Sequence, residues 1–249
     1  MSEPAERSSP WWYRRRGTLI GAIYGAGFLF GYSSLQGPPP QPAAVAWGLA
    51  LGGWAGVTIL AWLGVALVLV AWLWRAAGTA YLRREVVFSA DALQDRLVVA
   101  GPFRYVRNPL YLGNVFLALG VGLYAPPLGF AIIVAGNVAI VAFLAREEAH
   151  QMALRYGATF DAYRRAVPAF VPRLRPATVP GSAAATPSLR SALLGEAGVL
   201  LTAIALVPIA VFGSAGVVAF WILGAIALMT AYALNGWLHA RKAGTAPRT

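Results

Sequence analysis

The sequence predicts an all-α fold: a polytopic membrane helix bundle with about six transmembrane helices in three hairpins, plus cytoplasmic interfacial helices. Two observations lead to this prediction. The chain is 59% hydrophobic and only 12% charged, whereas a soluble domain carries about 25% charged residues, so most of its surface must face lipid. In addition, three windows contain no Asp, Glu, Lys, Arg or His: 17–74, 108–145 and 197–238.

Each window is long enough to cross the bilayer and return, because one helical crossing takes about 20 residues. A turn signal divides each window: Gly-Pro-Pro-Pro-Gln-Pro at 37–42, Ala-Pro-Pro at 125–127 and Gly-Ser-Ala-Gly at 213–216. Consecutive prolines end a helix because they lack the N–H and restrict the preceding residue. The expected spans are about 17–36, 48–74, 108–124, 127–146, 192–212 and 216–238.

Two stretches need further interpretation. The segment 43–74 is longer than one crossing needs, so it is either a tilted helix or a span with a short lead-in broken at Gly52–Gly53. The apolar run that follows the basic N-terminus has no small-residue cleavage site. We therefore expect a retained first span and not a signal peptide.

All Lys and Arg residues lie outside the three charge-free windows. In a six-span chain, the four segments that carry them fall on one side, which the positive-inside rule identifies as the cytoplasm, together with both termini. The net charge of +11 then indicates contact with anionic lipid headgroups and no nucleic acid partner. We expect an integral, multi-pass protein of a bacterial inner membrane.

The residue inventory excludes several kinds of site. Cysteine is absent, and the two histidines are His150 and His239. Disulfides, thiolate sites and Cys nucleophiles are therefore excluded, as is a His-rich metal centre. No metal site is expected.

The polar residues that remain gather at the cytoplasmic mouth of the second predicted hairpin. This hairpin starts at 107–109 and ends at 146–148. Two antiparallel helices joined by a tight turn bring their ends to roughly 10 Å from each other. We therefore expect the segment 101–111 to face Glu147 and Glu148.

A second amphipathic stretch, 150–167, follows the two glutamates. Its apolar residues recur every three or four positions, with Arg155, Arg164 and Arg165 between them, which predicts a helix lying in the membrane interface. The mouth thus combines arginines, paired carboxylates, an amide and tyrosines, a set that suits a ligand with a carboxylate, an ammonium and an aromatic ring. The alternative is that the arginines only fix topology and the tyrosines form an interfacial belt.

The segment Gly-Pro-Phe-Arg-Tyr-Val-Arg-Asn-Pro-Leu-Tyr-Leu-Gly at 101–113, with Glu-Glu at 147–148 and the Tyr-Gly, Phe, Tyr and Val-Pro positions up to 168, resembles a known superfamily. It is that of the isoprenylcysteine carboxyl methyltransferases and phospholipid methyltransferases. The resemblance covers roughly residues 55–175. Many members have His before the proline, whereas this chain has Asn108, which cannot ionise.

The resemblance implies an S-adenosylmethionine-dependent methyltransferase whose acceptor arrives from the bilayer. The residues it places at the cofactor are Arg104, Tyr105, Arg107, Asn108, Pro109, Tyr111, Gly113, Glu147 and Glu148. We assign His150 as the candidate general base near the mouth. Arg164 and Arg165, or Arg173, are the candidates to meet an anionic group of the acceptor.

The predicted organisation is an N-terminal tail and first span (1–50), a methyltransferase-like core (51–175), a linker (176–190) and a C-terminal hairpin with its tail (191–249). Expected partners are membrane lipids and a lipidic or small hydrophobic acceptor of the isoprenylcysteine carboxylate or phospholipid amine type, with the C-terminal hairpin as the candidate oligomer contact. Two other functions stay open. One is an NAD(P)H-dependent membrane reductase of the sterol reductase type, which resembles the motif, and the other is a non-enzymatic scaffold.

Overall fold

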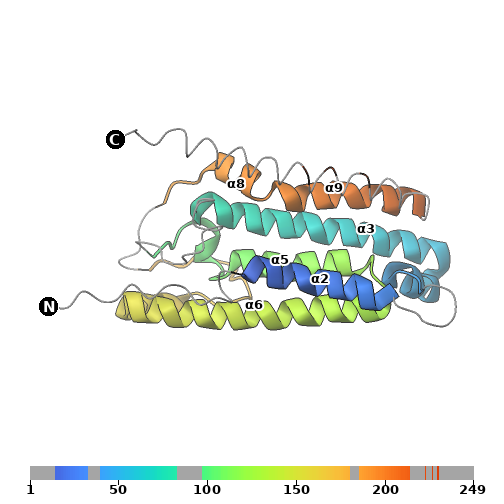
Figure 1. The fold of residues 1–249 in the computed structure, drawn as a ribbon. Coiled ribbons are helices and arrows are strands. Elements are labelled where there is room, and N and C mark those ends of the chain that lie inside the picture. The colour runs from blue at the N-terminus through green and yellow to red at the C-terminus, as the bar shows by residue number, and fades with distance from the viewer. Residues whose placement is uncertain are drawn as a thin grey trace, which may run out of the picture.

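The computed structural model describes residues 15–32, 40–82, 97–179 and 185–213, together with Ile222, Ile226 and Met229. The regular elements within these ranges are helical (Figure 1). The Gly-Pro turn at 37–39 and nearly all of the predicted last span, 216–238, lie outside the described residues. The elements are α2 (Arg16–Tyr32), α3 (Ala43–Leu82), the 3₁₀ helix η1 (Gly101–Arg104), α5 (Pro109–Gly122), α6 (Pro127–Tyr156), α7 (Ala158–Ala166), α8 (Leu189–Gly195) and α9 (Ala197–Phe212).

The apolar helices make this a membrane protein. Among the described residues, α3 and α6 are each long and apolar enough to cross a bilayer, and α8 with α9 adds a third crossing if the pair, bent by 53°, is counted as one span. Helix α5 is shorter, at 14 residues. The all-helical membrane bundle is therefore confirmed, while the six crossings and their pairing into three hairpins stay a prediction.

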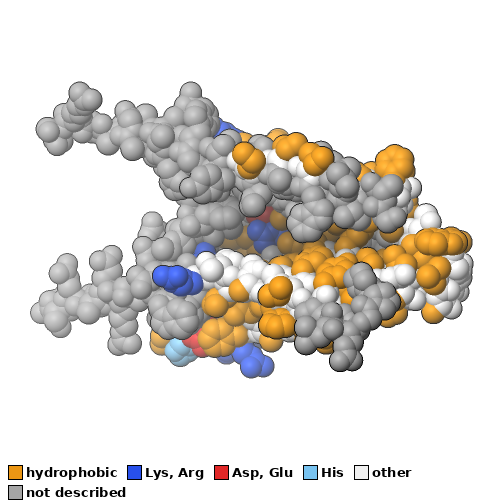
Figure 2. Space-filling view, turned by 45° about the vertical axis from the view of Figure 1, so that its right-hand side comes forward, with side chains coloured by type: hydrophobic (Ala, Val, Ile, Leu, Met, Phe, Trp, Pro, Cys, Tyr) orange, Lys and Arg blue, Asp and Glu red, His pale blue; other side chains and the backbone are white. Residues whose placement is uncertain are grey.

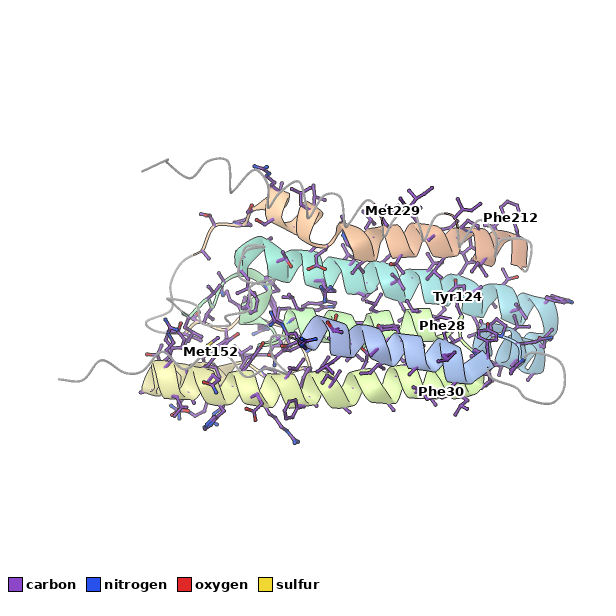
Figure 3. The ribbon with its side chains drawn as sticks, viewed as in Figure 1. Phe28, Phe30, Tyr124, Met152, Phe212 and Met229 are labelled. Carbon is purple, nitrogen blue, oxygen red and sulfur yellow. The ribbon has the colours of Figure 1, made fainter. Side chains whose placement is uncertain are left out.

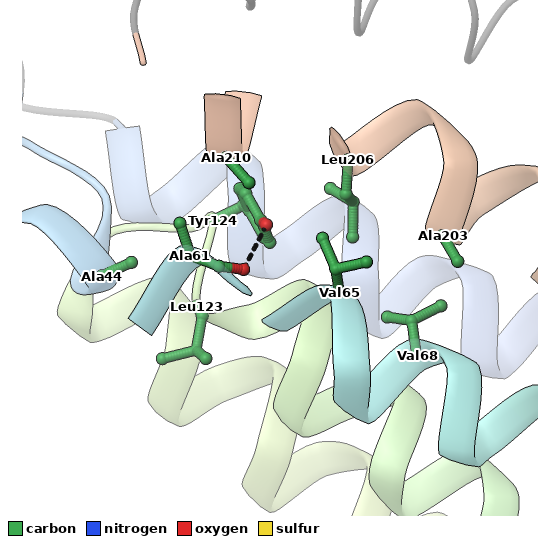
Figure 4. Close-up of a cluster of buried hydrophobic side chains, with 9 residues drawn as sticks. All are labelled: Ala44, Ala61, Val65, Val68, Leu123, Tyr124, Ala203, Leu206 and Ala210. Atoms are coloured by element: carbon green, nitrogen blue, oxygen red, sulfur yellow. Dashed lines mark hydrogen bonds between the residues drawn. The ribbon is translucent and has the colours of Figure 1, made fainter. Parts of the chain in front are cut away.

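The long helices lie side by side, with α3 between α9 and α5 and with α6 against both α5 and α2 (Figure 1). An apolar cluster joins α3, α9 and the residues just after α5, and within it the Tyr124 hydroxyl donates to the carbonyl of Ala61 at 2.7 Å (Figure 4). The members of the cluster are Ala44, Ala61, Val65, Val68, Leu123, Tyr124, Ala203, Leu206 and Ala210. Four of the nine members are alanines, whose small side chains let helices in lipid approach closely.

Glycine allows α2 and α6 to come close together. A Cβ atom at Gly129 would lie 2.4 Å from the carbonyl oxygen of Gly27, a separation that backbone atoms cannot relieve by changing a rotamer. At Gly25, also on α2, an added Cβ would meet nothing within 4 Å. Gly25, on the exposed face of α2, therefore serves as a control for Gly129, which lies in the interface.

We expect Gly129→Ala to lower the free energy of unfolding by about 1–3 kcal/mol, the typical cost of overpacking. Gly25→Ala is expected to be neutral or to stabilise by up to about 1 kcal/mol, because Ala is the better helix former. Thermal unfolding of both variants in detergent measures the difference. Equal melting temperatures would show that α2 does not pack on α6 in this way.

Helix α3 is broken near its start. Gly52 and Gly53 leave the helical region, with Gly53 at φ 62° and ψ −145°, a conformation that favours glycine. The lead-in then folds back so that Gly48 lies against the backbone of Gly56, and the N–H of Ala43 donates to Ala125 at 2.7 Å. Of the two interpretations offered above, the lead-in broken at Gly52–Gly53 is confirmed.

The predicted turns at 125–127 and at Gly213 are confirmed, whereas the predicted end of the helix that begins at Pro127 is wrong. Helix α6 starts at Pro127, and α9 ends at Phe212 before Gly213, as expected. The expected interfacial helix over 150–167 is wrong, because α6 continues to Tyr156 and a separate short α7 follows. Nothing in 146–156 breaks a helix; the break comes at Gly157, with φ 49° and ψ −124°.

Candidate functional site

The loop before α5 has a fixed shape. Gly101 adopts φ 54°, and a Cβ there would lie 2.2 Å from the ring of Tyr81, so only glycine fits between the end of α3 and this loop. Pro102 then occupies the first turn of η1. Pro109 starts α5, where a missing N–H costs nothing.

The segment 163–177, at the C-terminal side of α7, holds this loop in place. The buried Tyr163 contributes its hydroxyl, and burial raises the pKa of that hydroxyl, so it stays a protonated donor at neutral pH. The contacts are Tyr163 Oη to Phe103 O (2.9 Å), Arg107 N to Pro168 O (2.9 Å), Asn108 Nδ2 to Ala169 O (3.1 Å), Arg173 N to Tyr105 O (3.0 Å) and Ala177 N to Arg104 O (2.9 Å).

Two arginines of the loop are anchored through their Nε atoms. Arg104 donates to Ala177 O and Arg107 donates to Val167 O, each at 2.9 Å. For Arg107 this leaves the Nη nitrogens without a protein acceptor among the described residues. Burial, the largest effect, lowers the pKa of the Arg107 guanidinium. A half-buried guanidinium whose Nη atoms have no acceptor among the described residues can bind a carboxylate or phosphate.

The two predicted halves of the mouth meet. The Tyr111 hydroxyl on α5 donates to Glu148 Oε1 on α6 at 2.6 Å. The segment 101–111 and Glu148 are therefore neighbours, as the sequence predicted. Beside this bond lies a pocket at the end of the bundle that carries the loops, where Figure 3 places Met152, opposite the end that carries Phe212. Its lining residues are Leu82, Leu97, Val98, Phe103, Arg107, Asn108, Ala145, Glu148, Ala149, Met152, Phe160 and Tyr163.

The pocket has the lining of a small-molecule site, mostly apolar with a few polar groups. It is a small cavity of about 100 Å³ that opens outward. Apolar and aromatic side chains form most of the wall, and one cation, one carboxylate and one amide face the cavity. Among the described residues, no three His, Asp or Glu side chains lie close enough to hold a metal ion.

A comparison with known families decides the affiliation of this segment. Residues 44–159 match the phospholipid methyltransferase family, and that stretch contains both the Arg107–Asn108 corner and Glu148. The matched stretch, a little under half of the chain, is similar to that family. The superfamily resemblance drawn from the two motifs is thereby confirmed. The match suggests a membrane methyltransferase segment, whereas α8, α9 and the whole of the segment 163–177 lie outside it.

Two curated relatives are similar to the chain. The nickel-cobalt-cadmium resistance protein NccN of Alcaligenes xylosoxydans xylosoxydans is 30% identical over 48% of this chain. The cobalt-zinc-cadmium resistance protein CzcN of Cupriavidus metallidurans is 29% identical over 60% of it. The matches span 52% and 58% of these relatives, respectively, so the chain covers little more than half their length. No solved structure matches the chain.

The methyltransferase segment places the predicted site residues in three groups. Arg107, Asn108 and Glu148 line the pocket, and Tyr111 bonds to Glu148 beside it. Five others lie outside the lining: Arg104 and Tyr105, whose carbonyls pair with the 163–177 segment; Pro109 and Gly113, which are buried; and Glu147, on a different face of α6. The cofactor role of all these residues stays a prediction.

The structure does not bring the three predicted catalytic residues into the pocket. His150 is exposed near the end of α6, and Arg165 is exposed on α7. Arg164 is exposed as well and pairs with Asp161 at 3.1 Å. In an amphipathic α7 the buried Phe160 and Tyr163 take the inner face, so the arginines point outward.

The bundle contains a polar network that the sequence did not predict. Arg75 on α3 pairs with Glu196, at the bend between α8 and α9, with Nε and Oε2 2.6 Å apart. Thr79 donates to the other oxygen of Glu196 at 2.7 Å, and Arg75 Nη1 donates to Asn114 on α5. One signal was present in the sequence: Arg75 and Glu196 are the charges that border the first and third charge-free windows.

Proposed function

We propose that this protein is an integral membrane methyltransferase that uses S-adenosylmethionine to methylate a lipidic or small hydrophobic acceptor. The observation that carries the proposal is the pocket. There, Arg107 is half-buried and has no carboxylate partner in the described part of the chain. It and the Glu148 carboxylate face an apolar, partly aromatic wall. All of these groups except Phe160 and Tyr163 lie within the methyltransferase segment.

The donor set fits S-adenosylmethionine group by group. Its carboxylate suits the free Nη atoms of Arg107, because a guanidinium binds a carboxylate through parallel hydrogen bonds. Its ammonium or its ribose hydroxyls suit Glu148. Its adenine ring suits the apolar wall that Phe103 and Phe160 help to form. When bound, the cofactor supplies an electrophilic methyl group on a sulfonium.

The residues of this chain then have two tasks. They align the acceptor with the methyl group and keep water out, because methyl transfer is an in-line displacement that gains most from positioning. The clamp of hydrogen bonds from 163–177 fixes Arg107 and Asn108 for this purpose.

The need for a base depends on the acceptor. A carboxylate acceptor is already a nucleophile, whereas an amine or a thiol must first lose a proton. In our proposal His150 remains the candidate base for those two classes. Arg164 and Arg165 remain candidates to contact an acceptor anion, although all three lie outside the pocket lining.

Calorimetry on the detergent-purified protein tests the cofactor. We expect saturable binding of S-adenosylmethionine and of its demethylated product, and no binding of NADPH. Binding of NADPH without S-adenosylmethionine would favour the membrane reductase, and binding of neither would favour a non-enzymatic role. Incubation of lipid extracts with methyl-labelled cofactor, followed by mass spectrometry, identifies the acceptor.

A further inference from the structure

The network around Arg75 is buried among apolar helices. The Arg75 side chain is 14% exposed and that of Glu196 is fully buried. Both oxygens of Glu196 are used, one by Arg75 and one by Thr79. Gly113 makes room for the arginine, since a Cβ there would lie 2.5 Å from Arg75 Cγ.

This region has more hydrogen-bond donors than acceptors. Arg75 donates from its Nε to Glu196 and from its Nη1 to Asn114. No described residue accepts from its Nη2. Three buried side-chain atoms have no hydrogen-bond partner among the described residues. Two are donors, the Tyr24 hydroxyl on α2 and the Trp72 indole nitrogen on α3, and one is an acceptor, Asn137 Oδ1 on α6. The Tyr24 hydroxyl also lies near enough to Arg75 to interact with it electrostatically. Buried donors without acceptors are costly, so a ligand rich in acceptor oxygens would satisfy them.

The position of the network offers a route from lipid. Helix α2, which carries Tyr24, packs against α6 and makes no comparable contact with α3. Figure 2 shows a hollow in the bundle, with basic and acidic side chains on its floor. Asn114 lies three residues along α5 from Tyr111, whose hydroxyl bonds to Glu148 at the pocket. The network is therefore about one helical turn away from the candidate cofactor site.

We propose that Arg75, Asn114 and Tyr24 form a membrane-embedded headgroup site that binds the phosphate or carboxylate oxygens of the lipidic methyl acceptor. This assignment rests on the proposed methyltransferase function. Glu196 holds the guanidinium in position and offsets its charge, so the bundle stays stable before the acceptor arrives. The site takes the oxygen-rich end of the lipid, and the turn of α5 beyond it leads toward the transferred methyl group.

Native mass spectrometry with two single-chain amphiphiles, dodecyl phosphate and dodecanoate, tests the site on the full-length protein in neutral maltoside detergent. We expect the wild-type protein to bind at least one of them and Tyr24→Phe to bind it at least fivefold more weakly. The double variant Arg75→Gln/Glu196→Gln, which removes both charges together, is expected to lose at least tenfold. Arg146→Gln, at an exposed arginine of α6, serves as the control and should match the wild type.

The outcomes separate this site from the proposed function. Preference for dodecyl phosphate identifies a phospholipid-like headgroup, and preference for dodecanoate identifies a carboxylate. If Tyr24→Phe and the double variant both bind the amphiphiles as tightly as the wild type, the headgroup site is wrong. S-adenosylmethionine binding is measured in the same samples and is expected to be unchanged in Tyr24→Phe. Its absence from the wild type, with Tyr24-dependent amphiphile binding retained, would overturn the methyltransferase proposal alone.

Discussion

Glu148→Gln is expected to weaken S-adenosylmethionine binding about 10- to 100-fold, whereas Glu147→Gln changes it less than twofold. Glu148 lines the pocket and accepts from Tyr111, while Glu147 does neither. A hydrogen bond to a charged group contributes about 1.5–3 kcal/mol, and the exchange removes the charge but keeps the side-chain shape. Calorimetric titration of both variants measures the effect.

The pair of glutamines controls for folding as well as for chemistry. Glutamine keeps a carbonyl oxygen that can accept from Tyr111, so both variants should unfold near the wild-type temperature. Equal loss of binding in the two variants would indicate that both glutamates contact the cofactor. Unchanged binding in Glu148→Gln would remove this carboxylate from the cofactor site.

The largest expected loss of stability follows from Glu196→Ala. Arg75 would then remain in an apolar interior without its partner, and Thr79 would lose its acceptor. Breaking one side of a buried ion pair costs about 3–5 kcal/mol. Unfolding of the purified protein by heat or by denaturing detergent should show a change of this order.

A double exchange separates the ion pair from simple loss of packing. Replacing both partners by apolar residues of similar size is often close to neutral, so Arg75→Met/Glu196→Leu should recover more than half of the stability lost in Glu196→Ala. If the single and double variants are equally unstable, the charge of Arg75 is not what Glu196 compensates.

Local chain chemistry made the helix ends predictable. Proline at 126–127 and glycine at 213 restrict the backbone wherever they occur, and the break at Gly52–Gly53 depends on the same property. The length of α6 was not predictable in this way. Its residues 146–156 favour a helix as strongly as the apolar part does, and a change from apolar to charged residues does not end a helix.

The site was predictable only where a hairpin forces contact. The approach of Asn108 to Glu148 follows from two helices joined by a short turn. The anchoring of Arg104 and Arg107 depends on an irregular segment about 60 to 73 positions away, which has no periodic pattern. Arg75 and Glu196 are 121 positions apart, so neither residue identified the other before the fold was known.

The uninterrupted course of α6 sets the depth of Glu148 in the membrane. Glu148 follows Pro127 by 21 residues of continuous helix, a rise of about 32 Å, close to the roughly 30 Å thickness of the hydrocarbon layer. A helix that starts at one boundary of that layer therefore delivers this carboxylate to the opposite boundary. Under the proposed function, a water-soluble methyl donor and a hydrophobic acceptor would meet at this boundary. Removing one turn from α6 would move Glu148 into the hydrocarbon layer.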